Sequence, residues 1–167
     1  MTTRHFSLAA AILVASTATA VAEAVILSQP DAPLEITRFK ATYSSGSGSY
    51  PREGIEMRTS IKNKSNQAVT AYGLGFYAFD VFNEPLGRGL NGISLEAIDR
   101  DKEVTGAWAY QPLAAFKFER YGTGVAYVRQ VRFADGTVWK ADLSDVLREL
   151  QKIEDSLTLE DLSTVDK

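Results

Sequence analysis

The sequence of 167 residues contains no cysteine and only one histidine, His5. His5 lies in a leader described below, so the rest of the chain lacks the side chains of a Ser-His-Asp triad, a Cys-His pair, a common zinc site or a haem ligand set. Histidine carries much of the acid–base chemistry of proteins near neutral pH. We therefore expect no enzyme activity, no catalytic residues, no metal site and no cofactor.

The sequence also has no large excess of positive or negative charge. The 18 lysines and arginines stand against 21 aspartates and glutamates, the net charge is −3, and no basic run occurs. Binding to a phosphate backbone or an anionic bilayer needs clustered positive charge, so we expect no nucleic-acid partner. The hydrophobic share of 45% and the charged share of 23% are typical of a folded protein, and the length favours one domain.

The first 22 residues have the pattern of a secretory signal. A short basic region precedes an apolar stretch from Phe6 to Val14 and a run of small residues. Overlapping A-x-A cleavage patterns end at Ala20, Ala22 and Ala24. The apolar stretch is shorter than the roughly 20 residues that cross a bilayer. We therefore expect residues 1–22 to be cleaved, no transmembrane anchor afterwards, and a bacterial periplasmic or secreted location.

Residues 23–142 have the hydrophobic pattern of a β-rich domain. From Leu34 onward, apolar residues recur mostly at every second position, which indicates strands. The clearest run is Ile55, Met57, Thr59 and Ile61. A change of phase near Thr37-Arg38 predicts a β-bulge. Six or seven short strands separated by turns predict an all-β fold, an antiparallel β-sandwich of immunoglobulin or fibronectin type.

The segment from Val69 to Phe82 is apolar in both phases of a strand, from one end to the other. A strand of this kind is covered on both faces, or it changes phase midway. In the first case it needs a second layer over it, which the helical tail described below would provide. Asp80 is the exception in this run. We expect its carboxylate to accept backbone N–H groups of the turn Asn83-Glu84-Pro85.

A hairpin is predicted at Asp135-Gly136, a pair that suits the positive φ angles of a two-residue type I′ turn. That turn would place Phe133 opposite Val138. It would also place Arg132 opposite Trp139, with the guanidinium over the indole ring. Since Trp139 would then share its face with polar residues, we take Arg132 and Trp139 as candidate ligand-binding residues.

Residues 143–167 change to the period of an amphipathic helix, with Asp142 as a suitable N-cap. The apolar side chains that recur at intervals of three and four are Leu143, Val146, Leu147, Leu150 and Ile153. Two interpretations stay open. In one, this helical tail covers the sandwich. In the other, its apolar face is partner-binding and docks another envelope or secreted protein, or a second copy.

The residues Asn63 to Val69, followed by Phe76 to Asp80, resemble the hairpin of FxLYD-type and water-stress-type (late-embryogenesis-abundant-like) domains of exported bacterial proteins. The shared pattern is a polar Asn-Lys-Ser turn, a β-branched residue and an aromatic-rich strand that ends in Asp. The order departs from Leu-Tyr-Asp, because Phe79 precedes Asp80 here. The resemblance implies an immunoglobulin-like or fibronectin-like fold and an accessory, non-catalytic role, and it carries over no active site.

These observations predict a non-catalytic exported module of the bacterial envelope that acts by protein interaction, through an exposed sheet edge or its C-terminal helix. One alternative is a carbohydrate-binding or envelope-binding module that uses exposed aromatic side chains. A further alternative is a hydrolase with two carboxylates, for which Asp80, Glu84 and Glu119 lie near aromatic strands. The sequence does not show that any two of these carboxylates converge.

An acidic stretch contains Glu96, Asp99, Asp101 and Glu103. A calcium loop of the helix-loop-helix type needs Gly at its sixth position, where Val104 stands when the count begins at Asp99, and basic residues interleave. We therefore expect a solvated turn. Calcium should leave the thermal unfolding midpoint of the protein unchanged, and a rise of several degrees in a calcium titration would contradict this interpretation.

Overall fold

The computed structural model describes residues 23–45, 53–110 and 120–162, which form eight strands and two helices. The strands are β1 (Glu23–Ile26), β2 (Leu34–Ser45), β3 (Glu53–Asn63), β4 (Val69–Asp80), β5 (Leu90–Ser94), β6 (Glu103–Tyr110), β7 (Tyr121–Phe133) and β8 (Val138–Lys140). The helices are α1 (Leu143–Leu150) and α2 (Leu159–Leu162). The predicted leader, residues 1–22, and Glu119 lie outside the described residues.

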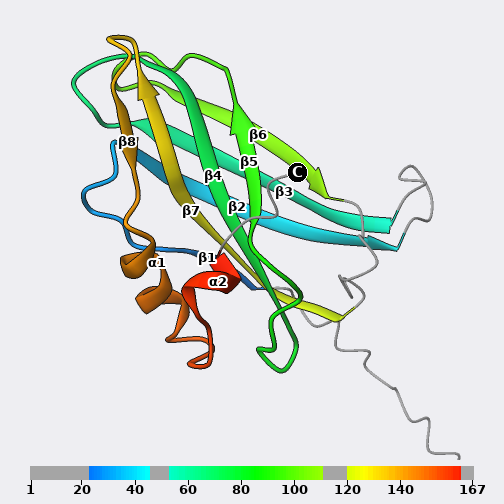
Figure 1. Ribbon diagram of the computed structural model, residues 1–167. Coiled ribbons are helices and arrows are strands. Elements are labelled where there is room, and N and C mark those ends of the chain that lie inside the picture. The colour runs from blue at the N-terminus through cyan, green and yellow to red at the C-terminus, as the bar shows by residue number, and fades with distance from the viewer. Residues whose placement is uncertain (1–22, 46–52, 111–119, 163–167) are drawn as a thin grey trace, which may run out of the picture.

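Two sheets pack face to face (Figure 1). Sheet A has the order β1-β7-β4-β5, with β8 paired to β7 as well, and sheet B has the order β2-β3-β6. The predicted β-sandwich with a C-terminal helix is confirmed. All described pairings are antiparallel except β1 with β7, which is parallel. The predicted bulge in β2 is confirmed by a register shift between Ile36 and Arg38.

The main core lies between the sheets. Sheet B contributes the alternating set that the sequence indicated, and Met57 and Ile61 are fully buried. Sheet A contributes Leu74 and Phe76, and the Phe76 ring lies 5.6 Å from the ring of Trp108, centroid to centroid. Aromatic pairs at this distance add to the hydrophobic stabilisation that comes from burial.

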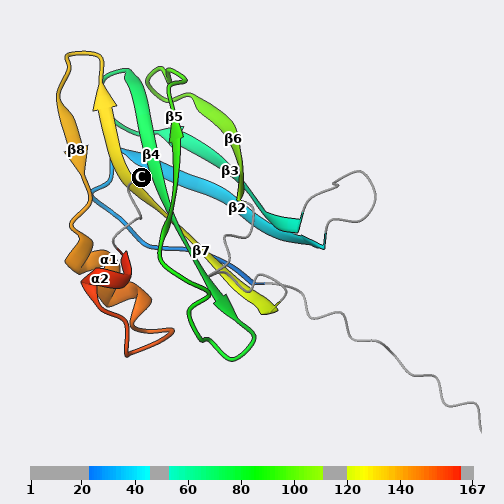
Figure 2. The ribbon, with the colours of Figure 1, turned by 45° about the vertical axis from the view of Figure 1, so that its right-hand side comes forward.

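A second apolar cluster covers the other face of sheet A. Tyr77 and Phe79 of β4 lie there with Val125 and Tyr127 of β7 and with side chains of α1 and α2. Figure 2 shows both helices against this side of the sheet. The expectation that β4 is covered on both faces is therefore confirmed, and the C-terminal segment supplies the second cover.

The five side chains proposed for partner binding belong to this second cluster. Val146 and Leu150 are buried in it, and Leu143, Leu147 and Ile153 pack against it while half-exposed. Of the two interpretations of the tail, the structure has the helix packed on the sandwich. Partner binding through this face would require the helix to leave the sheet. The N-cap prediction is confirmed, because the Asp142 carboxylate accepts the Ser144 N–H at 2.8 Å.

The tail is not one helix as far as residue 162. Helix α1 ends at Leu150, turns follow, and α2 begins only at Leu159. Thr158 precedes α2, and both its N–H and its hydroxyl donate to the Asp161 carboxylate, at 2.8 and 2.7 Å. The bond from the Thr158 N–H is the half of a capping box in which the third helical residue reaches back to the cap. Leu157 and Leu162 return to the second cluster, so the break lets the chain follow the sheet.

The predicted hairpin register is wrong by one residue. Val131 pairs with Trp139 and Arg132 pairs with Val138, so the loop has three residues. The reason is the backbone at Asp135-Gly136: only Gly136 has a positive φ, +86°, whereas a type I′ turn needs positive φ at both positions. The Gly136 N–H donates to the Phe133 carbonyl at 3.0 Å, and the Asp135 carboxylate accepts the Thr137 N–H. This arrangement is typical of a type I turn followed by a bulge.

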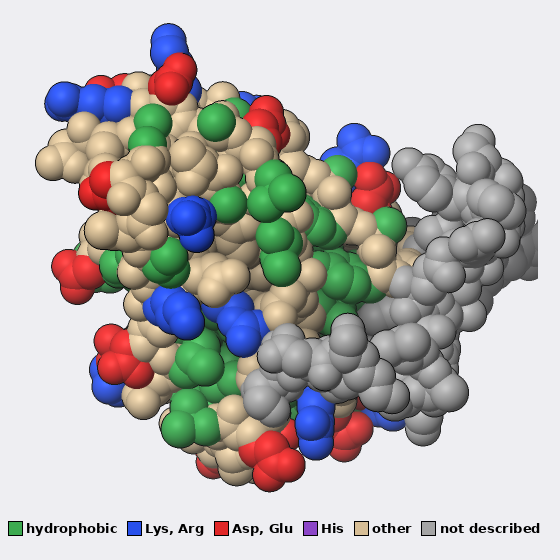
Figure 3. All heavy atoms as spheres, turned by 45° about the horizontal axis from the view of Figure 1, so that its top comes forward, with side chains coloured by type: hydrophobic (Ala, Val, Ile, Leu, Met, Phe, Trp, Pro, Cys, Tyr) green, Lys and Arg blue, Asp and Glu red, His purple; other side chains and the backbone are tan. Residues whose placement is uncertain are grey.

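Some large apolar side chains remain exposed. Val81 and Phe82, which the sequence pattern placed in the long strand, lie beyond its end at Asp80 and are 58% and 76% exposed. On β5 and just after it, Ile93 and Leu95 are also exposed. On the face drawn in Figure 3, groups of hydrophobic side chains lie between lysine and arginine side chains.

Helix α1 is expected to be part of the folding unit. We predict that Leu150→Ala, at a fully buried position of the second cluster, lowers the free energy of unfolding by about 2–5 kcal/mol, because it removes apolar contacts and leaves a cavity. Urea unfolding measures the change. Leu159→Ala, at a half-exposed position of α2, is the control and should cost clearly less. Equal losses for the two variants would contradict the assignment of α1 to the core.

Candidate binding groove

One edge of β7 is shared by two strands that do not meet. β1 pairs with β7 from Thr123 to Ala126, and β8 pairs with it from Gln130 to Arg132. Backbone bonds extend each pairing a little further, from Leu27 N–H to the Ala126 carbonyl and from Ala141 N–H to the Arg129 carbonyl. Between the two strands the backbone of Val128 faces a gap in the ladder.

The side chain of Gln29 fills that gap. Its carboxamide accepts the Val128 N–H at 2.6 Å and donates to the Val128 carbonyl at 2.9 Å. A carboxamide has one acceptor and one donor group, the same pair that a neighbouring strand presents. Gln29 therefore takes the place of a strand residue, and the β1–β2 linker that carries it is held against β7.

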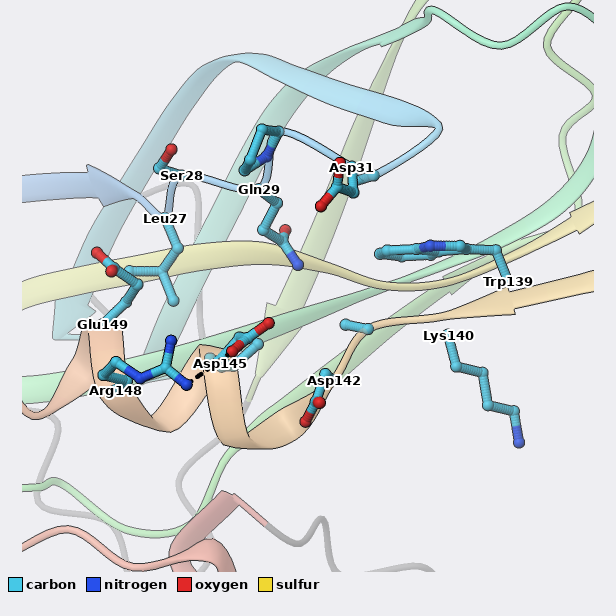
Figure 4. Close-up of a pocket in the computed structure, with 14 residues that line it drawn as sticks. Leu27, Ser28, Gln29, Asp31, Trp139, Lys140, Asp142, Asp145, Arg148 and Glu149 are labelled. Atoms are coloured by element: carbon cyan, nitrogen blue, oxygen red, sulfur yellow. Dashed lines mark ion pairs between the residues drawn. The ribbon is translucent and has the colours of Figure 1, made fainter.

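A groove of about 430 Å³ lies beside Gln29. One wall is the linker from Leu27 to Ala32, and the other is the end of β8 and the first two turns of α1. Figure 4 shows Trp139 at one end of the groove and the α1 side chains Asp145, Arg148 and Glu149 below the linker. The apolar residues that line it are Leu27, Pro30, Ala32, Trp139, Ala141 and Val146.

The charges around the groove are mainly negative. Asp31, Asp142, Asp145 and Glu149 line it, against Lys140 and Arg148. Arg148 forms an ion pair with Asp145 at 2.9 Å, and Lys140 points away from the groove in Figure 4. The Asp142 carboxylate is used as the helix cap. Glu149 forms an ion pair with Lys152 at 2.6 Å. Among the described residues, Asp31 is therefore the lining carboxylate that takes part in no ion pair or helix cap. The groove combines an aromatic wall with this acidic side chain, an arrangement that attracts a cationic group.

The structure separates the two predicted ligand-binding residues. Trp139 shares a face with the fully buried Val131 and packs against the main core, whereas Arg132 lies on the opposite face and is exposed. The predicted stacking of Arg132 on the indole is therefore wrong, because the register differs by one residue and successive side chains of a strand alternate. Trp139 lines the groove, and Arg132 is not among its lining residues.

Asp80 has the turn role that the sequence indicated. Its carboxylate is buried and accepts the N–H groups of Phe82, at 2.7 Å, and Glu84, at 3.0 Å. Arg120 contacts both Asp80 and Glu84. Desolvation raises the pKa of Asp80, but the two backbone N–H groups and the guanidinium outweigh it and hold the pKa below its usual value. This carboxylate stays ionised and engaged, which suits a structural role better than a hydrolytic one.

The acidic side chains that follow β5 interact with different partners. Glu103 accepts the Thr37 hydroxyl at 3.0 Å and forms an ion pair with Arg38, and Asp101 forms one with Arg100. Among the residues that the structure describes, no three acidic or histidine side chains gather in a way that could hold a metal ion. In the same part of the chain, no helix is long and apolar enough to cross a bilayer.

The sequence pattern singled out Trp139, which lines the groove, but not Gln29 or the linker. Gln29 precedes Pro30 in a short polar segment, which is typical of an ordinary turn. Its partner Val128 is 99 residues away along the chain, and nothing local indicates that contact. The gap along β7 depends on where β1 and β8 end, which only the folded chain defines.

The Gln29 contact can be tested directly. We predict that Gln29→Ala lowers the free energy of unfolding by about 1–3 kcal/mol, because it leaves the N–H and carbonyl of the buried Val128 without partners. Amide hydrogen exchange at Val128 should become faster in the variant. Asn66→Ala removes an exposed carboxamide and should change neither measurement. Unchanged exchange at Val128 in Gln29→Ala would contradict the proposed strand-like role.

Comparisons with known proteins concern the fold alone. No protein-family model and no curated protein matches the sequence. Among solved structures, the chain is similar to a hypothetical protein from Peptoclostridium difficile 630, with a TM-score of 0.55 and 14% identity over 73% of this chain and 93% of that chain. A Northeast Structural Genomics Consortium target gives a TM-score of 0.41 at 14% identity, over 65% of this chain and 80% of that chain.

Proposed function

We propose that the chain is a non-catalytic binding module of the bacterial envelope, and that its groove takes a basic segment of another envelope or secreted protein. The observation that carries the proposal is the groove itself: an indole wall, a polar linker held in place by Gln29, and a surplus of carboxylates. A lysine or arginine side chain that lies over the indole and near Asp31 satisfies both features.

The absence of histidine and cysteine after the predicted leader supports a binding role rather than catalysis. So does the engagement of Asp80, the one buried carboxylate among the hydrolase candidates that the structure describes, with backbone N–H groups and Arg120. The signal pattern of residues 1–22 supports a periplasmic or secreted location. The resemblance to accessory domains of exported proteins points the same way.

Carbohydrate binding is the second candidate, and Trp139 is the observation that favours it. An indole at the end of a polar groove is a stacking surface for a sugar ring, and carboxylates accept hydrogen bonds from sugar hydroxyls. A sugar gains little from net negative charge, whereas a basic segment does. The surplus of carboxylates therefore favours the protein segment.

The test is a titration with three short peptides of equal length, one rich in lysine and arginine, one neutral and one acidic, and with an unbranched oligosaccharide. We expect only the basic peptide to bind, and to change the tryptophan emission of the protein. Asp31→Asn should weaken binding about twofold to fivefold and Trp139→Ala about fivefold or more, because each removes one of the two attractions for the cation.

Asp155→Asn is the matched control, since Asp155 is an exposed carboxylate that does not line the groove. It should leave the dissociation constant within about twofold of the original, in line with an exposed charge outside the site. Equal binding of basic and neutral peptides would refute the charge argument. Binding of the oligosaccharide alone, lost in Trp139→Ala, would favour the carbohydrate candidate instead.

A further inference from the structure

The described sheet edges differ in how they are protected against pairing with another strand. β2 carries a bulge and the charged side chains Glu35, Arg38 and Lys40. β1 has four residues and β8 has three. On β5, the Ile93 carbonyl accepts the Trp108 indole N–H at 3.4 Å. Short length, charge, bulges and capped groups are the usual ways in which an edge is kept from pairing.

Within the described residues, β6 has no bulge and carries a single charged side chain, Glu103. It runs for eight residues in unbroken register with β3, contains no proline or lysine, and within the described residues pairs with β3 alone. Its outward side chains after Glu103 are Thr105, Ala107 and Ala109, all small and uncharged. In Figures 1 and 2 it forms the outer edge of sheet B.

The one charged side chain of β6 is turned away from this edge. The Glu103 carboxylate accepts the Thr37 hydroxyl at 3.0 Å and forms an ion pair with Arg38 at 3.3 Å, and both partners belong to β2 on the far side of β3. A charge that would otherwise oppose an approaching strand is therefore held over the sheet. The other face of β6 carries Val104, Trp108 and Tyr110, which are half-exposed at the rim of the main core.

We infer that β6 is an association edge, and that its occupant is a second copy of this chain paired antiparallel through β6. A twofold axis at Ala107 places that residue opposite its own copy and Thr105 opposite Ala109. This pairing opposes no like charges. The joined sheet has the order β2-β3-β6-β6-β3-β2. The half-exposed apolar side chains of the two inner faces are covered together, which supplies a hydrophobic contribution.

A second copy fits this edge better than a strand of foreign sequence. When a peptide adds to a sheet edge, pockets for its alternate side chains give specificity, and the outward residues of β6 are too small to form pockets. Two copies of β6 present identical small side chains to each other, so the pairing needs no pockets. A contact built on one pair of eight-residue strands is small beside the roughly 1,600 Å² of a stable complex, so the dimer is weak and reversible. It is independent of the groove, which lies beside β1 and β8.

Sedimentation equilibrium over a range of concentrations tests the inference. The purified protein should show a reversible monomer–dimer equilibrium. Ala107→Lys sets like charges directly opposite each other and should raise the dissociation constant about tenfold or more, as should Ala107→Glu. A mixture of the two variants should associate again, because opposite charges then meet. Thr42→Lys adds the same charge at an exposed position on β2 and should leave the dissociation constant unchanged.

Amide hydrogen exchange of the unaltered protein gives a second measurement that needs no variant. Exchange should slow with concentration at amides of β6, and not at those of β2. A protein that stays monomeric up to its solubility limit would overturn the inference. A dimer whose formation leaves the β6 amides unprotected, or whose affinity Ala107→Lys does not change, would overturn it as well, because association would then use another surface.

Discussion

The structure depends on the burial of β4 and β7 on both faces. These two paired strands carry apolar side chains toward sheet B and, on the other side, Tyr77, Phe79, Val125 and Tyr127. A sandwich of two sheets covers only one face of each strand. The C-terminal segment must therefore return to sheet A and supply a third layer, and the hydrophobic effect fixes α1 there through Val146 and Leu150.

That constraint also creates the groove. The chain has to leave β7 through a hairpin, pair briefly as β8 and turn into α1 within a few residues, so β8 covers only the end of the β7 edge. β1 covers the other end in parallel. Gln29 closes the interval with two hydrogen bonds to Val128, and the linker, Trp139 and α1 then surround a space that none of them fills.

The two proposed surfaces lie on opposite sides of the sandwich. The groove is on the side where β1 and β8 flank β7 and where β1 lies against β2. The β6 edge is on the side where Trp108 reaches the Ile93 carbonyl of β5. Two copies joined through β6 would therefore keep both grooves open. Binding of a basic segment by a pair of grooves would gain from the linkage, since the second binding event becomes intramolecular.

Several features follow from the sequence alone, because they are local. The alternation of Ile55, Met57, Thr59 and Ile61 defines a half-buried strand, the phase change at Thr37-Arg38 defines the bulge, and the double-faced run after Val69 requires two covers. The Asp142 cap and the Asp80 turn depend on neighbours within four residues, so short-range chemistry determines them. The lack of cysteine, and of histidine after His5, narrows the possible side-chain chemistry of residues 6–167 whatever fold they adopt.

The tertiary structure decided the rest. The hairpin register depended on whether Asp135 adopts a positive φ, and a one-residue change turned Trp139 from the solvent toward the core and separated it from Arg132. Gln29 and Val128, which are hydrogen-bonded, lie 99 positions apart in the chain. Glu103 lies 66 and 65 positions from its partners on β2, Thr37 and Arg38. Such contacts form only when segments that are distant in the sequence lie side by side. The local sequence around each partner therefore does not predict them.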